Sequence, residues 1–228
     1  EISACLVGSE MCIRDRDTDK LIFNEDINQV ALKADVLIFA IPSAFLHTQL
    51  ELLSVDISKK KVVSAIKGII PEFGLLAGEY FQQQKQLPFN QIAVIGGPCH
   101  AEEVALERLS YLTIACNNAP FAAEVASRLS CDYILIKTHD DVIGAEYAAM
   151  LKNIYAIAAG ISHGLGYGDN FQSVLMSNAI REMKRYIKKV CKLKRKINET
   201  IYLGDLLVTG YSTFSRNRMF GNMICLLY

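Results

Sequence analysis

The chain has 228 residues, of which 51% are hydrophobic, and its formal net charge is zero. This size and composition are typical of a soluble globular protein of one or two domains, and the balanced charge argues against a general nucleic-acid binder. The seven cysteines lack paired spacing, which argues against a disulfide framework or a zinc site and favours a reducing, cytoplasmic setting. The four histidines lie in separate segments with no ligand spacing, so we expect no metal site.

The first sixteen residues, EISACLVGSEMCIRDR, contain acids and lack the apolar core of a signal peptide. They look like translated adaptor sequence, and the closing segment from Cys225 looks similar. We therefore interpret residues 1–16 as an artefact-like or disordered leader.

Strand and helix patterns alternate along residues 17–138. Helical patterns cover 26–33, with Asn24 or Asp26 as the cap, and then 45–53, 74–84 and 120–129. Apolar runs typical of buried parallel strands cover 35–40, 61–66, 91–95, 111–116 and 133–136. This alternation predicts an α/β fold with a doubly wound, parallel, Rossmann-type sheet.

The pattern changes after Thr138, where strands stop and helices take over. We therefore predict a domain boundary near His139 and a helical domain over residues 139–228. A long helix of small and apolar residues is expected from Val142 to a glycine-rich turn at 164–168. Because Glu146, Lys152 and Asn153 interrupt it, a buried core helix fits better than a membrane span.

A second long helix is predicted over about 171–196. Eight cations lie between Lys184 and Lys196, which could mark a nucleic-acid or anionic-membrane surface. An apolar stripe at helical spacing favours instead a solvated basic face on an amphipathic helix; it comprises Met183, Tyr186, Val190, Leu193 and Ile197.

Three segments follow successive strands: Pro42 to Phe45, Lys67-Gly68, and Gly96 to Ala101. Ligands of doubly wound sheets bind beyond the carboxyl ends of the strands. Ordinary turn chemistry explains each segment equally well, since turns need Gly and Pro. Three at successive strand ends favour a binding edge.

Lys152 is the one cation in the middle of the long helix. Its helical neighbours are Ala148, Ala149, Tyr155 and Ala156, so its amine springs from an apolar, close-packed face. Burial lowers the pKa of an amine, which suits it to proton transfer near neutral pH. The alternative is a lysine that reaches solvent along a packed helix.

Ser215, Arg216, Asn217 and Arg218 are consecutive donors in a glycine-flanked segment. Guanidinium, hydroxyl and amide donors suit a phosphate group, although a surface loop with incidental charges is the alternative. Asp205 could hold a lysine or a substrate hydroxyl, or could cap a helix.

Four segments carry a resemblance to a known family: Gly97-Pro-Cys-His-Ala-Glu-Glu103, Leu151-Lys-Asn-Ile154, Gly204-Asp-Leu206 and Ser215-Arg-Asn-Arg-Met-Phe-Gly221. Together and in this order they resemble NAD(P)-dependent glycerol-3-phosphate dehydrogenase, from about Asp17 to Ile224. The resemblance implies interconversion of dihydroxyacetone phosphate and sn-glycerol 3-phosphate with NAD(H) or NADP(H), as a step toward phospholipid synthesis.

The resemblance also implies roles for individual residues. Lys152 matches the proton donor and acceptor. Substrate-binding positions are matched by Lys67, Gly97, Cys99, Asp205, Ser215, Arg216 and Asn217. Cofactor-binding positions are matched by Phe45, Lys67, Ala101 and Arg216. Cys99 stands where the family has serine or threonine.

The family's first βαβ unit, with its G-x-G-x-x-G turn, should precede Asp17, and further helices should follow Gly221. We therefore expect a partial sheet followed by a truncated all-helical domain, with a small phosphorylated substrate, a possible homodimer, and neither nucleic acid nor a membrane span. Alternatives are a related dehydrogenase, such as a hydroxyacid dehydrogenase or ketopantoate reductase, and a non-catalytic fragment.

Overall fold

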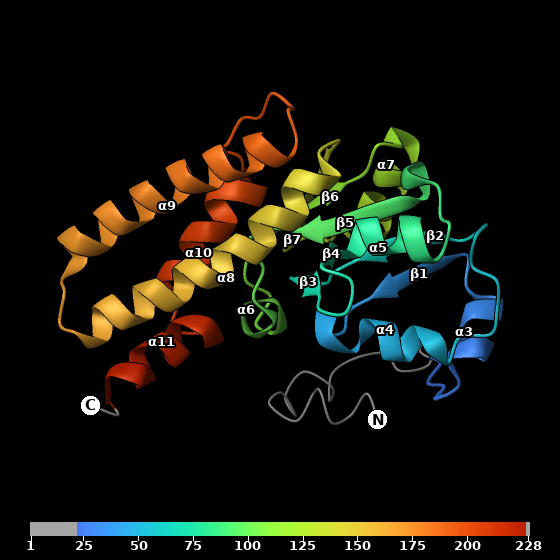
Figure 1. Ribbon diagram of the computed structural model, residues 1–228, viewed down its shortest axis with the longest axis horizontal. Helices are drawn as coiled ribbons and strands as arrows, with labels where there is room; N and C mark the ends of the chain where they lie inside the picture. Colours follow the sequence, from blue (N-terminus) through green and yellow to red (C-terminus); the bar gives the residue numbers. More distant parts are fainter. Residues whose placement is uncertain (1–21, 227–228) are drawn as a thin grey trace.

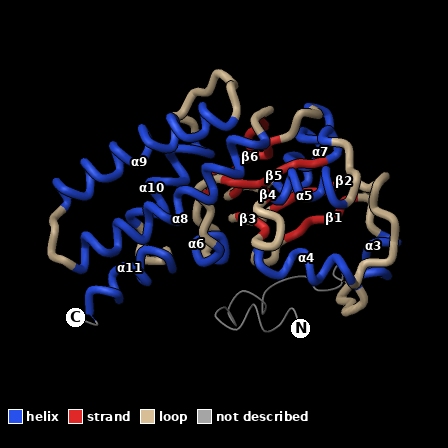
Figure 2. Tube along the Cα trace, viewed as in Figure 1, coloured by secondary structure: helices blue, strands red, loops and turns tan. Residues whose placement is uncertain are grey.

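The computed structural model describes residues 22–226, and the predicted leader at 1–16 lies outside this range. One half of the molecule is a sheet with its covering helices, and the other half consists of helices α8 to α11 (Figure 1). Helix α8 (Val142–Gly164) begins at the sheet and runs through the helical half, as the trace in Figure 2 also shows. The predicted α/β class with a following helical part is confirmed.

The sheet has five strands in the order β1-β2-β5-β6-β7. Their bounds are β1 Val36–Phe39, β2 Lys61–Ser64, β5 Ile92–Gly96, β6 Ser110–Ala115 and β7 Ile134–His139. The helices around them are α3 Ile27–Lys33, α4 Ser43–Glu51, α5 Ala77–Gln84, the 3₁₀ turn η2 Phe89–Gln91, α6 Ala101–Ala105 and α7 Ala119–Leu129. Asp26 is the cap of α3, since its side chain accepts from the Asn28 N–H.

Alternate residues of the strands enter different cores. Val63, Ala93 and Ile114 pack with α7, whereas Val94 and Ala115 pack with α8 on the opposite face. Successive side chains of a strand point to opposite faces, so a sheet covered on both sides needs continuous apolar runs. This is why the strands could be predicted from their apolar runs.

The sheet is mixed rather than wholly parallel, because β6 pairs antiparallel with β5. The other neighbouring pairs are parallel. The connection from β5 to β6 contains only α6, five residues long, which rises about 7.5 Å. Such a helix is too short to carry the chain back to the opposite edge of the sheet. Strand β6 therefore starts at the edge where β5 ends and runs in the opposite direction.

The predicted helix over 74–84 begins later, at Ala77. The preceding residues form a small hairpin of β3 (Ile69–Ile70) and β4 (Leu75–Leu76). Gly74 has φ +64° and donates its N–H to the Ile70 carbonyl, so it closes a turn that a helix could not contain.

The second long helix, α9 (Asp169–Val190), is also shorter than predicted. Residues 191–199 form a loop, since Arg195 turns inward to an ion pair with Asp141. The predicted stripe is therefore only partly correct: Met183 is buried, but Val190 and Leu193 are exposed. The cations of α9 itself lie on its exposed face.

The chain continues through a π-helical turn, η3 (Thr200–Gly204), into α10 (Asp205–Tyr211) and α11 (Arg216–Leu226). Cys225 lies in α11, with its Sγ 3.4 Å from the Ile161 carbonyl oxygen of α8. The closing residues 227 and 228 lie outside the described range. Whether a domain boundary falls near His139 stays a prediction; β7 ends there and α8 starts three residues later.

Helices α8 and α11 are in backbone contact through glycines. A Cβ on Gly160 would overlap the Arg218 carbonyl oxygen and lie 2.8 Å from the Asn222 nitrogen. A Cβ on Gly221 would likewise overlap the Ile157 carbonyl oxygen. The glycine that ends the SRNRMFG segment is therefore required for packing, and this contact sets where Arg216 and Asn217 lie along α8.

Helix α8 is joined to α5 by a buried carboxyl group. Both oxygens of Glu146 lie within hydrogen-bond distance of the Gly78 N–H, at 3.0 and 3.2 Å, in the first turn of α5. Burial raises the pKa of Glu146 to about 8, with a further contribution from the nearby Glu79 charge, against the opposing Gly78 hydrogen bond. The neutral acid is therefore the favoured form of Glu146 in the folded protein at pH 7.

Gly160→Ala should destabilise the protein by about 1–3 kcal/mol, because two backbones must separate to admit the methyl group. Gly168→Ala is the matched control: nothing lies within 4 Å of its Cβ position, and replacing glycine at this helix cap should cost less than about 1 kcal/mol. Urea unfolding of the two variants measures this, and equal stabilities would contradict the close α8–α11 contact.

Glu146→Gln should become more stable relative to the parent protein as pH rises from 5 to 8. The unfolded parent ionises near the ordinary pKa of 4.5 while the folded parent holds its proton up to about 8, so raising the pH through this window favours unfolding. The amide does not titrate and keeps an acceptor for the Gly78 N–H. Urea unfolding at several pH values tests this, and a pH-independent difference between the two proteins would show that Glu146 ionises normally.

Candidate active site

Lys152 lies in the middle of α8 and is buried, with 5% of its surface exposed. Its Nζ donates to Asp205 Oδ1 at 2.6 Å. Asp205 is the first residue of α10 and is 2% exposed. Lys152 therefore does not reach solvent, and the alternative of a snorkelling lysine is wrong.

Three influences act on the Lys152 ammonium. Burial is the largest and lowers its pKa, the Asp205 carboxylate raises it, and the ammonium of Lys67 lowers it. The net result is a pKa below the ordinary value for lysine. Lys152 can therefore release a proton more readily than an exposed lysine and can still be held in the charged form by Asp205.

The second carboxylate oxygen of Asp205 has no partner among residues 22–226, although it is buried. A buried acceptor without a hydrogen bond is costly, so it marks a place where a donor from outside the described chain belongs. Asp205 thus holds the lysine with Oδ1, while its predicted contact with a substrate hydroxyl stays a prediction.

The three predicted segments at strand ends do meet, since β1, β2 and β5 run parallel and end at one edge. Gly68 has φ +141°, and its Cβ position lies 2.9 Å from Ser43 Oγ at the start of α4. Gly97 has φ +124°, and a Cβ there would lie 2.7 Å from the Tyr111 carbonyl oxygen. Both positions need glycine, and both leave bare backbone at this edge.

Cys99 belongs to the same cluster. It is half-buried, and burial raises the pKa of its thiol, while a hydrogen bond from Ser110 and the charge of Lys67 oppose this. The charge of the Asp205 carboxylate also raises the pKa of this thiol. The structure thus brings Lys67, Cys99, Lys152 and Asp205 together from four separate segments.

The SRNR segment starts α11. Ser215 is buried and its Oγ accepts from the Arg218 N–H at 3.3 Å, so it caps the helix. Arg216 is exposed and Asn217 is half-buried, and neither side chain makes a hydrogen bond to another described residue. Both side chains are therefore available for a ligand, but no contact joins them to Lys152.

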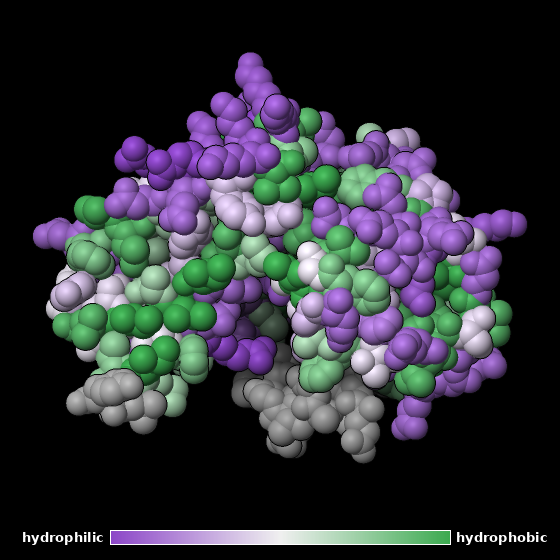
Figure 3. Space-filling view, viewed as in Figure 1, coloured by the Kyte–Doolittle hydropathy of each residue, from purple (hydrophilic) through white to green (hydrophobic). Residues whose placement is uncertain are grey.

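Phe45 and Ala101 lie at the beginnings of helices. Phe45 is in the first turn of α4 and is 59% exposed, and Ala101 is the first residue of α6 and is also exposed. Their predicted contact with a cofactor stays a prediction. Figure 3 shows hydrophilic surface hollowed between the two halves on the face drawn there.

Some polar groups near the site were not predicted. The Nε2 atom of His100 and the Nε atom of Arg218 are buried without a partner in the described part of the chain. The sequence predicts Arg218 as one of four consecutive donors, but it does not predict His100, although that residue lies inside the segment 97–103. Asp141 and Tyr202, by contrast, meet across 61 residues, and no local pattern signals such a contact.

No helix in residues 22–226 is both long enough and apolar enough to cross a membrane. The same residues contain no group of three or more His, Cys, Asp or Glu side chains that could hold a metal ion.

The chain matches two family models. Residues 16–122 match the N-terminus of NAD-dependent glycerol-3-phosphate dehydrogenase, and residues 141–226 match its C-terminus. Glycerol-3-phosphate dehydrogenase [NAD(P)+] of Listeria innocua is 36% identical over 193 residues, which is 84% of this chain and 57% of that protein. The enzyme of the same description from an Exiguobacterium species is 40% identical over 164 residues, 72% of this chain and 48% of the relative.

A crystal structure of glycerol-3-phosphate dehydrogenase from Coxiella burnetii superimposes on this chain with a TM-score of 0.78 at 30% sequence identity. The superposition covers 88% of this chain and 61% of the Coxiella chain. The chain thus spans about three fifths of the length of such relatives. The two family models between them extend over most of the sheet half and over the helical half. The chain belongs to the NAD-dependent glycerol-3-phosphate dehydrogenase family.

Proposed function

We propose that the protein interconverts dihydroxyacetone phosphate and sn-glycerol 3-phosphate with NAD(H) or NADP(H), and that Lys152 is its proton donor and acceptor. The observation that carries this proposal is the buried Lys152–Asp205 pair, at 2.6 Å, beside a free carboxylate oxygen and the Lys67 ammonium. Membership of the family supports the substrate and the cofactor.

The residues at the sheet edge fit a nicotinamide cofactor. Gly68 and Gly97 present backbone without side chains beyond parallel strands, which is where dinucleotides bind in doubly wound sheets. Phe45, Lys67 and Ala101 would contact the cofactor from this edge, and Arg216 would contact it from the start of α11. When bound, the cofactor supplies the hydride.

Reduction of a ketone builds negative charge on its oxygen. The ammonium of Lys152 would donate a proton to that oxygen, and the ammonium of Lys67 would stabilise the charge as it develops. In the reverse direction the amine of Lys152 would take the hydroxyl proton. Asp205 keeps Lys152 in place, and its Oδ2 would accept a hydrogen bond from a substrate hydroxyl.

The phosphate group would be held by Ser215, Arg216 and Asn217, with Gly97 and Cys99 completing the substrate site. A guanidinium next to an amide gives the paired donors that phosphate oxygens accept. Fixing the phosphate fixes the carbonyl relative to Lys152, which converts binding energy into orientation. A thiol is a weaker donor than a hydroxyl, so Cys99 would contribute mainly shape.

The setting and the partners are part of the same proposal. We infer a cytoplasmic enzyme whose partner is a small phosphorylated molecule, with a homodimer as the assembly. The basic face of α9 is then solvated surface and binds no nucleic acid. Light scattering of the purified protein measures its mass in solution, and the mass of a monomer would contradict the proposed homodimer.

The purified protein should oxidise NADH or NADPH only when dihydroxyacetone phosphate is present. Lys152→Ala should lower kcat by ~10²-fold or more, the usual effect of removing a general acid. The loss of absorbance of the reduced cofactor measures both rates. Lys184→Ala on the exposed face of α9 is the control lysine and should leave kcat unchanged. Near-normal turnover by Lys152→Ala would remove this residue from the mechanism.

Arg216→Ala should raise KM for dihydroxyacetone phosphate by roughly 10- to 100-fold, the value of one or two lost charge-assisted hydrogen bonds. With unphosphorylated dihydroxyacetone as substrate and the reduced cofactor at saturation, the KM of the variant for the ketone should match that of the parent protein. Arg181→Ala, which removes an exposed guanidinium from α9, is the control. A KM for the phosphorylated ketone that stays unchanged would show that the phosphate binds elsewhere.

A further inference from the structure

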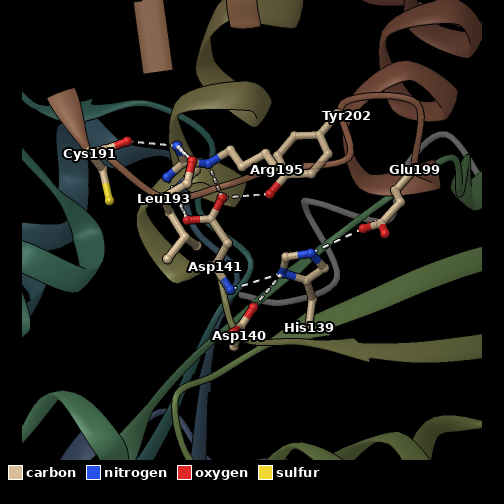
Figure 4. A network of polar contacts seen from close by, with 9 residues as sticks. His139, Asp140, Asp141, Cys191, Leu193, Arg195, Glu199 and Tyr202 are labelled. Carbon is tan, nitrogen blue, oxygen red and sulfur yellow. Dashed lines mark hydrogen bonds and ion pairs between the residues drawn. The ribbon is translucent and has the colours of Figure 1, made fainter. Parts of the chain in front are cut away.

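The Asp141 carboxylate is the centre of a buried polar network that the sequence did not predict (Figure 4). Its Oδ1 accepts from the Gly144 N–H at 3.0 Å and from Arg195 Nη2 at 2.9 Å. Its Oδ2 accepts from Arg195 Nε and from the Tyr202 hydroxyl, the latter at 2.6 Å. Asp141 is 3% exposed, so one buried carboxylate receives four hydrogen bonds.

The hydrogen bonds of the network offset the cost of burying the Asp141 charge. Burial alone would raise the pKa of Asp141, but the hydrogen bonds from Arg195, Tyr202 and Gly144 hold it below the ordinary value. Burial raises the pKa of the Tyr202 phenol, and the adjacent Asp141 carboxylate raises it further. These shifts favour an anionic Asp141 and a neutral Tyr202 that donates to it near neutral pH.

The network joins the two segments that carry the proposed catalytic pair. Asp141 is the cap of α8, eleven residues before Lys152, a rise of about 16 Å along the helix. Tyr202 lies in η3, three residues before Asp205. The same two segments are thus connected twice, by Tyr202–Asp141 at one end and by Asp205–Lys152 at the other.

His139 and Glu199 strengthen the first connection. His139 Nδ1 accepts from the Asp141 N–H at 2.9 Å, and His139 Nε2 lies 3.0 Å from Glu199 Oε2. The ring edge of His139 packs against Tyr202, with centroids 6.0 Å apart and an interplanar angle of 87°. Glu199 precedes η3 directly, so the beginning of this turn is held at the end of β7 and its middle, through Tyr202, at the start of α8.

The turn itself depends on such fixing. A π-helical turn is a rare conformation, and it is retained where the surroundings hold it. Ile201 packs against Gly96 of β5, and Gly204 packs against Pro98, so η3 also rests on the segment that carries Gly97 and Cys99. The position of Asp205 is therefore set by contacts made before it in the chain.

We propose that Tyr202, through its hydrogen bond to Asp141, is a positioning residue that holds Asp205 on Lys152. The proposal rests on the function proposed above for Lys152, but it concerns a contact that lies outside the substrate and cofactor sites. Loss of the phenolic hydroxyl frees η3 from the start of α8, and the Lys152–Asp205 pair loosens while the proposed phosphate-binding residues of α11 stay in place.

Tyr202→Phe tests this by removing one oxygen atom. The expected result is a fall in kcat on the order of tenfold or more, the effect of a small misplacement of reacting groups, with KM for dihydroxyacetone phosphate little changed. The alkaline limb of the kcat profile for ketone reduction should also move to lower pH. The Asp205 carboxylate raises the pKa of Lys152 while burial and Lys67 lower it, so a looser pair lets Lys152 lose its proton earlier.

Tyr155→Phe is the matched control. Tyr155 is a buried tyrosine on α8 whose hydroxyl has no partner among residues 22–226, so its removal breaks no hydrogen bond there. It should leave kcat and the pH profile unchanged. If Tyr202→Phe behaves like Tyr155→Phe, the proposal is overturned.

A second measurement separates this proposal from the proposed function. In protein labelled with ¹³C at lysine Cε, the Lys152 signal, assigned by its absence in Lys152→Met, should titrate at lower pH in Tyr202→Phe than in the parent or in Tyr155→Phe. This holds even for a protein without turnover. Arg195→Lys keeps a cation at Asp141 but loses the paired guanidinium hydrogen bonds, so it should shift the Lys152 titration in the same direction by a smaller amount. It replaces Tyr202→Phe in this test if that variant fails to fold. Identical titrations in all variants would overturn the positioning role and leave the proposed function untouched.

Discussion

The structure depends on the burial of a lysine–aspartate pair between two helices. Taking an ammonium and a carboxylate out of water costs several kcal/mol for each ion, and only close geometry and further hydrogen bonds offset it. Lys152 and Asp205 meet at 2.6 Å, yet one carboxylate oxygen remains without a partner in the described chain. The pair is therefore tolerated by the fold rather than optimised for stability, which is typical of groups that serve chemistry.

Two features of the backbone make this burial possible. Small residues around Lys152 let α10 approach α8, and glycines at the α8–α11 crossing let a third helix approach as well. The same glycines place the exposed Arg216 and the half-buried Asn217 at the start of α11. One motif thus combines helix packing with the proposed phosphate site, since the glycine of SRNRMFG determines where its arginine and asparagine lie.

Much of the fold could be predicted because its signals are local. Apolar runs located the strands, small residues located α8, and the environment of Lys152 followed from its helical neighbours. The direction of β6 could not be predicted, because an apolar run does not show which way its strand points. The short connection through α6 determines that direction. Arg195 could not be distinguished from seven other cations nearby, because its partner lies 54 residues earlier. The predicted positions of Lys67, Cys99 and Asp205 at one site are supported by their proximity, but that grouping came from resemblance and not from pattern.

The Asp141 network has a consequence for the order in which the chain folds. Helix α8 is complete at residue 164, while the side chains that satisfy its cap carboxylate come from residues 195 and 202. A chain leaving the ribosome therefore leaves the Asp141 carboxylate without its full set of partners until Tyr202, 61 residues after Asp141, has emerged. Contacts this distant in sequence slow the search for the native state, because the intervening loop must close before they contribute. We therefore expect η3 to dock onto α8 late in folding and to bring together the polar cap and the Lys152–Asp205 pair as it docks.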